Sequence, residues 1–295
     1  MTLETIAAKV SAGERLTGSE GKDLLSTADI ISLGMLAEDV RRRRHGDQVT
    51  FLRVAHLTVD SAVGADPLLH SAGEVRLDGR PESIEEAAAA LRAVVARAGG
   101  IPVSAFSLAE LDDLARRAKV SLEVCLCELR DAGLERVAQA ALDSPMKFDE
   151  ALEAAAKAGV GVSQVVFEHE GEDWLQKIQQ LVSSQDVSRS IRALAPLARR
   201  PNPNMPTTGY EDLKKVALAR LFADNIETIQ VDWSLYGPKL AQVALTFGAD
   251  DLDNVPAADD LSLGPRRTPL EEVRRNIQTA ALVPVQRNGR WEVIG

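Results

Sequence analysis

Along the chain, segments in which apolar residues recur with the two-residue period of a strand alternate with segments in which they recur with the 3.6-residue period of a helix. VTFLRVAHL (49–57) has the alternating, β-branched-rich pattern of a strand, and EVRLDG (74–79) and IPVSAFS (101–107) have it again. Between the last two, residues 82–99 carry apolar side chains at helical spacing, with an acidic start and a glycine end. This part of the chain is therefore predicted to alternate strands with helices.

The alternation continues to residue 248. Helices are expected over LAELDDLARRA, SLEVCLCELRDAG, 148–159, EDWLQKIQQLVSSQ, 210–225 and 238–248, and extended segments over 160–171, 188–198 and 228–237. A helix that links two strands makes their pairing parallel, which indicates an α/β fold. With six or seven β/α units and no glycine-rich dinucleotide fingerprint, we predict a complete or partial (β/α) TIM-type barrel.

Three regions are expected along the chain. Residues 1–48 form an N-terminal helical extension, because apolar residues recur at helical spacing from Thr5 to Arg44. Residues 49–254 form the barrel. Residues 255–295 form a C-terminal extension that packs on the barrel.

Composition and charge exclude several classes of protein. A net charge of −10 and a pI near 5.1 argue against general nucleic-acid binding, which needs an excess of cations. The basic run Arg41–Arg44 is interpreted as the solvated end of a helix. The chain has no apolar signal region or membrane-length apolar stretch, and two cysteines exclude a disulfide framework, so we expect a soluble, cytoplasmic protein.

The cysteines and histidines give few candidates for chemistry. Cys125 and Cys127 lie two residues apart on an expected helix, so they cannot chelate one metal, and we interpret them as packing residues and expect no metal site. Of the histidines at 45, 56, 70 and 169, only His169 ends a predicted strand, among acids. At a barrel mouth it would contact a ligand or transfer a proton; otherwise it is a surface-loop histidine.

Three aspartates in FGADDLDN (247–254) follow the last helix of the barrel region. Asp250, Asp251 and Asp253 could bind a hard cation, bind the hydroxyls of a ribose-like ligand, or form a solvated turn. Gly79, in a turn after the second strand, is either a ligand contact or a strand-to-helix connection. Trp233 belongs to the core or lines a pocket.

Residues 207–254, from TTGYEDLKK to FGADDLDN, resemble the C-terminal part of a radical-SAM family from the menaquinone (futalosine) pathway. The family includes aminofutalosine synthase, which the chain resembles most, and dehypoxanthine futalosine cyclase. EVRLDGRPES and LVPVQRNGRWEVI resemble further parts of it, so the similarity covers most of the chain. The resemblance implies a barrel whose aspartate segment lies at the mouth and faces a nucleoside, with His169 at the position of a family histidine.

The chain departs from this family at the centre of its chemistry. Family members follow the first strand with a CxxxCxxC motif that holds a [4Fe–4S] cluster and binds S-adenosylmethionine. Here TVDSAVGADPLLHSAGEVRLDG follows that strand and contains no cysteine. We therefore expect no cluster, and binding of S-adenosylmethionine is disfavoured.

Three possibilities stay open from the sequence, and the plainest is a shortened barrel retained without any ligand pocket. The favoured one is a degenerate barrel without radical chemistry, which binds a nucleoside or intermediate or acts as a partner subunit of a cluster-containing homologue or of a second copy. The alternative is an enzyme with acid/base or metal-assisted chemistry at the barrel mouth, using His169 and the aspartates. Neither nucleic acid nor a membrane is expected as a partner.

Overall fold

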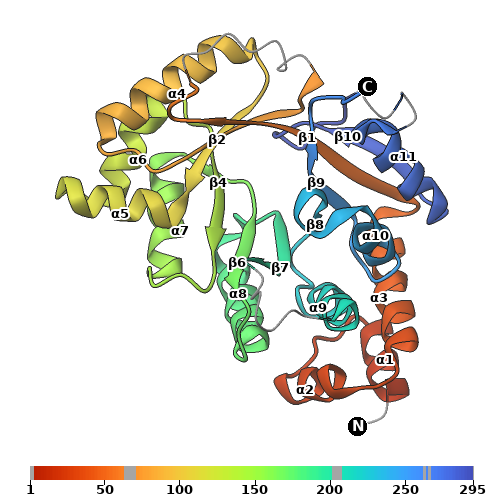
Figure 1. Ribbon diagram of the computed structural model, residues 1–295. Helices are drawn as coiled ribbons and strands as arrows, with labels where there is room; N and C mark the ends of the chain where they lie inside the picture. The colour runs from red at the N-terminus through yellow and green to blue at the C-terminus, as the bar shows by residue number, and fades with distance from the viewer. Residues whose placement is uncertain (1–2, 63–70, 201–207, 262–263, 265–266, 295) are drawn as a thin grey trace. The chain divides into compact units, whose positions relative to one another are not determined.

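The computed structural model describes residues 3–62, 71–200, 208–261, 264 and 267–294 (Figure 1). The chain divides into two compact units, each made of three segments. Unit 1 consists of Met1–Thr50, Val166–Asp253 and Val273–Pro284. Unit 2 consists of Phe51–Val165, Asn254–Glu272 and Val285–Gly295.

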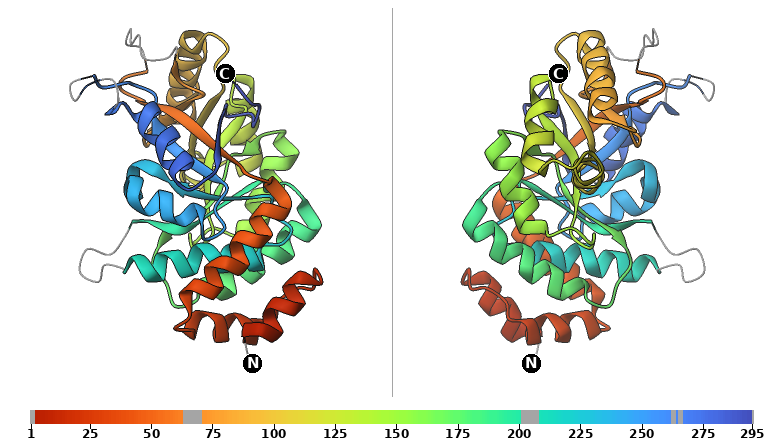
Figure 2. Two further views of the ribbon diagram at one scale, coloured as in Figure 1. Left: turned by 90° about the vertical axis from the view of Figure 1, so that its right-hand side faces the viewer. Right: turned by 90° about the vertical axis from the view of Figure 1, so that its left-hand side faces the viewer.

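Unit 1 begins with three helices, α1 (Leu3–Ser11), α2 (Gly18–Ser26) and α3 (Ile30–His45). The Thr17 side chain and Glu20 form a capping box at the start of α2, and the Asp29 carboxylate accepts from Ser32 N to cap α3. The red N-terminal helices gather beside the later helices α8 (Trp174–Ser188) and α9 (Gly209–Phe222), against which α2 packs (Figures 1 and 2). The helical N-terminus predicted from periodicity is confirmed.

The strands of unit 1 lie in the order β6-β7-β8-β9. Their bounds are Val165–His169 for β6, Ala193–Arg200 for β7, Thr228–Asp232 for β8 and Asp251–Pro256 for β9. β7, β8 and β9 pair in parallel, and helix α10 (Trp233–Leu245) follows β8 directly. The register sets Gln230 beside Asp251 and Asp232 beside Asp253.

Alternation along these strands separates two chemistries. Ile229, Val231 and Leu252 are at most 1% exposed and form an apolar face, which α9 and α10 cover. Neighbouring positions of the same strands carry polar side chains, which point to the opposite face because successive residues of a strand alternate. A buried polar face on two adjacent strands, β8 and β9, is costly without partners, so its contacts decide what the site can do.

Unit 2 repeats the β/α pattern. Its strands are β1 (Gln48–Thr58, from Phe51 onward), β2 (Glu74–Asp78), β3 (Val103–Ser107), β4 (Arg136–Ala141) and β5 (Gly161–Val162). Its helices are α4 (Ile84–Ala98), α5 (Leu108–Ala118), α6 (Leu122–Asp131) and α7 (Phe148–Ala158). β1 to β5 pair in parallel in sequence order, as the predicted crossover helices require.

The C-terminal part contributes α11 (Pro269–Thr279) and β10 (Val283–Arg287). The Arg287 guanidinium lies 3.6 Å from the centroid of the Trp291 ring, and Gly289 N donates to Gly73 O. A Cβ at Gly289 would come within 2.6 Å of the Glu74 carboxylate, so a larger residue here would displace the Glu74 side chain. Within unit 2 the C-terminal turn thus packs onto the start of β2.

The sequence pattern missed β10 and two strands of the parallel sheet. RVAQAA was not predicted as β4, because alanine has little strand preference, and DLDNVP was not predicted as β9, because aspartate and asparagine are rare in strands. Both form strands because they pair with neighbouring strands. The expected extended segment 228–237 is also wrong beyond Asp232, where WSLYG is helical and Gly237, with φ +75°, separates it from the helix that Pro238 begins.

The interpretation of Arg41–Arg44 as a solvated run is wrong for Arg41. Its side chain is fully buried, pairs with Glu38 at 2.7 Å and donates to the carbonyls of Gly46 and Gln48. Burial of the guanidinium is possible because these acceptors replace water. In the part of the chain that the structure describes, no helix is long and apolar enough to cross a membrane.

Candidate functional site

The three aspartates predicted as ligand contacts are all buried, and they point in different directions. Asp250 precedes β9, whereas Asp251 and Asp253 lie on that strand, two residues apart and therefore on the same face. Asp250 is 4% exposed, Asp251 0% and Asp253 1%. Of the three alternatives, the solvated turn is therefore wrong, because Asp251 and Asp253 lie on a paired strand and all three aspartates are buried.

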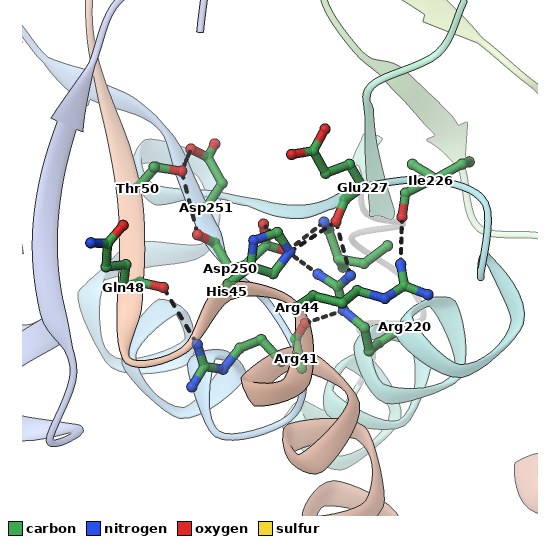
Figure 3. Close-up of polar contacts among 12 residues, drawn as sticks. Arg41, Arg44, His45, Gln48, Thr50, Arg220, Ile226, Glu227, Asp250 and Asp251 are labelled. Atoms are coloured by element: carbon green, nitrogen blue, oxygen red, sulfur yellow. Dashed lines mark hydrogen bonds and ion pairs between the residues drawn. The ribbon is translucent and has the colours of Figure 1, made fainter. Parts of the chain in front are cut away.

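Asp250 is held by a network toward the helices (Figure 3). Its carboxylate pairs with the fully buried Arg220 of α9, accepts from Ile229 N at 2.8 Å and lies 3.4 Å from His45 Nε2. Arg220 also donates to the carbonyls of Gly248 and Glu227. Asp250 thus joins the end of α3, α9 and the start of β9, which is a structural role.

Burial sets the electrostatics of this network. Desolvation, with repulsion from Arg44 and Arg41, lowers the pKa of Arg220 to about 9. Desolvation also lowers the pKa of His45, so His45 is neutral near pH 7. The carboxylate of Asp250 is therefore matched mainly by one cation, Arg220.

Asp251 lies on the polar face of the strands. Thr50 Oγ1 donates to its carboxylate, as Figure 3 shows, and Gln230 Nε2 donates at 2.8 Å. Gln230 is 2% exposed, and its Oε1 has no hydrogen-bond partner among the residues that the structure describes. This layer consequently offers an unused acceptor oxygen beside a carboxylate.

One layer further along the strands, Arg199 near the end of β7 joins two carboxylates, Asp232 at the end of β8 and Asp253 beside it on β9. Its guanidinium pairs with Asp232, the last residue of β8, and lies 3.9 Å from the carboxylate of Asp253. Asp232 also accepts from Leu235 N at 2.8 Å and so caps α10. One guanidinium thus faces two carboxylates at the strand ends where α/β proteins bind ligands.

Unit 1 has further polar and charged side chains beside these strands. Glu170 pairs with Lys215, and Tyr236 donates to the Ala198 carbonyl at 2.6 Å. Burial raises the pKa of Tyr236, and the carboxylates of Asp212 and Glu170 add to the rise, so its phenol stays protonated. Tyr236 is therefore a fixed neutral donor and not a base.

The other predicted residues lie apart from this layer. His169 is the last residue of β6 and is exposed, between Glu168, which pairs with Arg200 at 3.1 Å, and Glu170. Trp233 is 5% exposed at the start of α10. Gly79 belongs to unit 2, with φ +127° just after β2, and His70 lies outside the described residues.

Sequence reasoning missed Arg199, Asp232 and Gln230. A signal was present in TIQVD, where Thr228, Gln230 and Asp232 alternate with Ile229 and Val231, but it was used only to predict a strand. Arg199 gave no such signal, because its pairing with Asp232 depends on how β7 and β8 lie together. Within the described chain, no three histidine, cysteine, aspartate or glutamate side chains are grouped to hold a metal ion.

Solved structures define the class of fold. The chain is similar to methylornithine synthase, with a TM-score of 0.69 and 16% identity over 95% of this chain and 97% of that one. It is also similar to the FeFe-hydrogenase maturase HydG from Carboxydothermus hydrogenoformans, with a TM-score of 0.64 and 13% identity over 96% of this chain and 79% of that one. The fold is a TIM-type (β/α) fold, as predicted.

Sequence comparison adds one matching family and two relatives. Residues 175–294 match the family described as CofH/MqnC C-terminal region. The chain is 26% identical to cyclic dehypoxanthine futalosine synthase of Streptomyces coelicolor, over 98% of this chain and 88% of the relative. It is also 26% identical to aminodeoxyfutalosine synthase of Thermus thermophilus, over 98% and 95%. These matches support the resemblance to the futalosine-pathway family that the sequence indicated.

The residues of this chain do not fit the iron–sulfur cluster that the family resemblance implies. Its cysteines number two in 295 residues, both on α6, and three thiolates are needed. Cys125 is fully buried, and desolvation, with repulsion from Glu128, raises the pKa of its thiol to about 11, so it is not a thiolate near neutral pH. The alignment with the Streptomyces protein spans 355 positions, more than the 295 residues here, so the relative carries segments that this chain lacks.

Proposed function

We propose that the protein is a cluster-free member of the futalosine-pathway family that binds a nucleoside-type intermediate and performs no radical chemistry. The observation that carries this proposal is the layer of Arg199, Asp232 and Asp253, at the C-terminal ends of β7 and β8 and on the neighbouring strand β9. Two buried carboxylates beside a guanidinium are costly to desolvate, so stability alone gives little reason for such a layer. Retention of such a layer favours a role in binding.

The chemistry of the polar face favours a ligand rich in hydrogen-bond donors. Asp232, Asp251 and Asp253 present carboxylate oxygens, and Gln230 presents an acceptor without a partner among the described residues. Ribose hydroxyls and amino groups are donors that carboxylates bind well. Two relatives are named for the synthesis of molecules of that kind, cyclic dehypoxanthine futalosine and aminodeoxyfutalosine.

The cysteine content supports the proposal that the protein performs no radical chemistry. The two cysteines share one helix in unit 2, and the segment after β1 contains none. Reductive cleavage of S-adenosylmethionine needs the cluster, and the sequence has too few cysteines to hold it. A nucleoside-binding protein of this kind could hold an intermediate or act as the partner subunit of a cluster-containing homologue, or of a second copy.

Thermal denaturation of the full chain with candidate ligands tests the binding proposal. Aminodeoxyfutalosine, dehypoxanthine futalosine and S-adenosylmethionine are added separately to iron-free protein. A ligand that binds only the folded state raises the midpoint, by about 2.7 kcal/mol of stability at one hundred times its Kd. We expect a rise with one of the nucleosides and none with S-adenosylmethionine.

Two variants make the result specific. Asp253→Asn should abolish the ligand-induced rise while the protein stays folded, whereas Asp131→Asn, an exposed residue of α6, should leave it unchanged. No rise with either nucleoside would overturn the binding proposal. A stoichiometric [4Fe–4S] spectrum after anaerobic reconstitution with iron and sulfide would overturn the cluster-free assignment.

A further inference from the structure

A second group of polar side chains lies on strands of unit 2, at or near the C-terminal ends of β1 and β2. His56 of β1, Asp78 of β2 and Asn254 of β9 come from three strands and meet at one imidazole ring. His56 Nδ1 lies 2.5 Å from the Asp78 carboxylate, and Nε2 lies 2.6 Å from Asn254 Oδ1. This group shares no residue with the aspartate layer of unit 1.

The contacts define the protonation of the ring. Both nitrogens face acceptor oxygens, and an imidazole donates from both only when it is protonated. The hydrogen bond to Asp78 raises the pKa of His56 above its ordinary 6.5, burial opposes the rise, and Asn254 adds to it. Arg76, the other nearby charge, lowers it slightly and is itself paired with Glu74 at 2.9 Å.

The group is open to small molecules. The side chains of His56 and Asp78 are 44% and 46% exposed, in contrast to the nearly buried Arg76 and Glu74 one layer below. An exposed ion pair contributes little to stability, because water competes for both charges. A gain in stability therefore does not explain well why both ring nitrogens of His56 contact acceptor oxygens.

Asn254 is held in an unusual backbone conformation. Its φ is +61°, in the left-handed region that glycine adopts freely and that costs other residues energy, asparagine less than most. In this conformation its carboxamide oxygen lies on His56 Nε2. An sp² oxygen of another molecule that accepted from His56 Nε2 would occupy the same position as this carboxamide oxygen.

We propose that His56, with Asp78 behind it, is the donor of a second ligand site, which takes the acyl oxygen of a carboxylate or carboxamide at Nε2 by displacing the Asn254 side chain. Asp78 fixes the ring orientation and keeps the Nδ1 proton. His56 then donates to the incoming oxygen without proton transfer. The ligand class is a small molecule with an accessible carboxylate or carboxamide, and the site stands or falls independently of the nucleoside site.

The test uses full-length protein with labelled histidines and NMR detection of the imidazole signals. Acetate and acetamide are the probes, titrated into wild type and Asn254→Gly. Glycine suits φ +61° and removes the competing oxygen without straining the backbone. We expect the His56 signals of Asn254→Gly to shift with at least one probe at concentrations several-fold lower than in wild type.

Controls keep the result interpretable. His169, exposed at the end of β6, should not shift with either probe, and His56→Gln identifies the His56 signals by their loss. In Asp78→Asn the pKa of His56 should fall and probe binding should weaken. A response of Asn254→Gly to acetate alone would identify a site for carboxylates. A response to both acetate and acetamide would identify a site for acyl oxygens in general. If neither probe shifts His56 in Asn254→Gly, or if wild type and Asn254→Gly respond equally, the proposal is overturned.

Discussion

Asp250 and Asp253 lie three residues apart and both carry a buried carboxylate, but the two carboxylates have different neighbours and therefore different roles. Asp250 faces the helices, where Arg220, Ile229 N and His45 occupy its oxygens. Asp253 faces the other side of the strands, where Arg199 is shared with Asp232 and its nearest guanidinium nitrogen is 3.9 Å away. A strand sends neighbouring residues to opposite faces, so one acidic segment contributes both to the scaffold and to the candidate site.

The largest effect is expected from breaking the scaffold side. Arg220→Met leaves Asp250 as a buried charge without its main cation, and such a change costs about 3–5 kcal/mol. Urea denaturation measures the loss. If Arg220→Met unfolds at the same urea concentration as wild type, Asp250 is not held as described.

A second variant separates the charge from the packing. Asp250→Asn combined with Arg220→Met removes both charges, so it should recover a large part of the stability that Arg220→Met loses. The same denaturation measurement shows whether the two effects couple. Additive losses would contradict a buried ion pair as the basis of this contact.

On the site side, Arg199→Met should affect binding more than folding. The Arg199 side chain is 13% exposed and pairs with both Asp232 and Asp253, so its loss removes a cation that the two carboxylates share. We expect nucleoside affinity to fall at least about tenfold, as for a lost charge-assisted contact, with a stability loss smaller than that of Arg220→Met. Titration calorimetry and urea denaturation, done on the same samples, compare the two losses.

The two roles of Asp232 can be separated by substitution. Asparagine keeps the hydrogen bond from Leu235 N, whereas alanine loses it at a cost of about 1 kcal/mol. Asp232→Asn should therefore be close to wild type in stability but weaker in ligand binding, and Asp232→Ala should lose both. Equal stability of the two variants would show that the cap contributes nothing.

The smallest effect concerns His56 and pH. Its pKa is raised in the folded protein, so the stabilisation is complete below the ordinary value of 6.5 and is lost as pH rises through the raised value. Asp78→Asn should reduce the free energy of unfolding more at about pH 5.5 than at about pH 9. A difference that is equal at both pH values would contradict the ion pair.

The sequence predicts the architecture better than the site. Strands such as VTFLRVAHL and EVRLDG have patterns that local residues determine, and the parallel fold follows from the helices between them. β9 is different, because DLDNVP becomes a strand only by pairing with β8. Without that strand, the opposite orientation of Asp250 and Asp253 could not be foreseen.

The same limit applies to the site residues. Asp253 was found as one of three clustered aspartates, but its partner Arg199 comes from 54 positions earlier, and only the sheet brings them together. Conversely, the absence of the cluster cysteines can be read directly from the sequence, because it depends on residue type and not on geometry.

Titration calorimetry of iron-free, chelator-treated protein with aminodeoxyfutalosine and dehypoxanthine futalosine tests the central claim most directly. Wild type and Arg199→Met are compared under the same conditions. The claim predicts saturable binding of at least one nucleoside by the iron-free wild type, and a large loss of affinity in Arg199→Met. Binding that develops only after reconstitution with iron and sulfide, or no binding in any state, would contradict it.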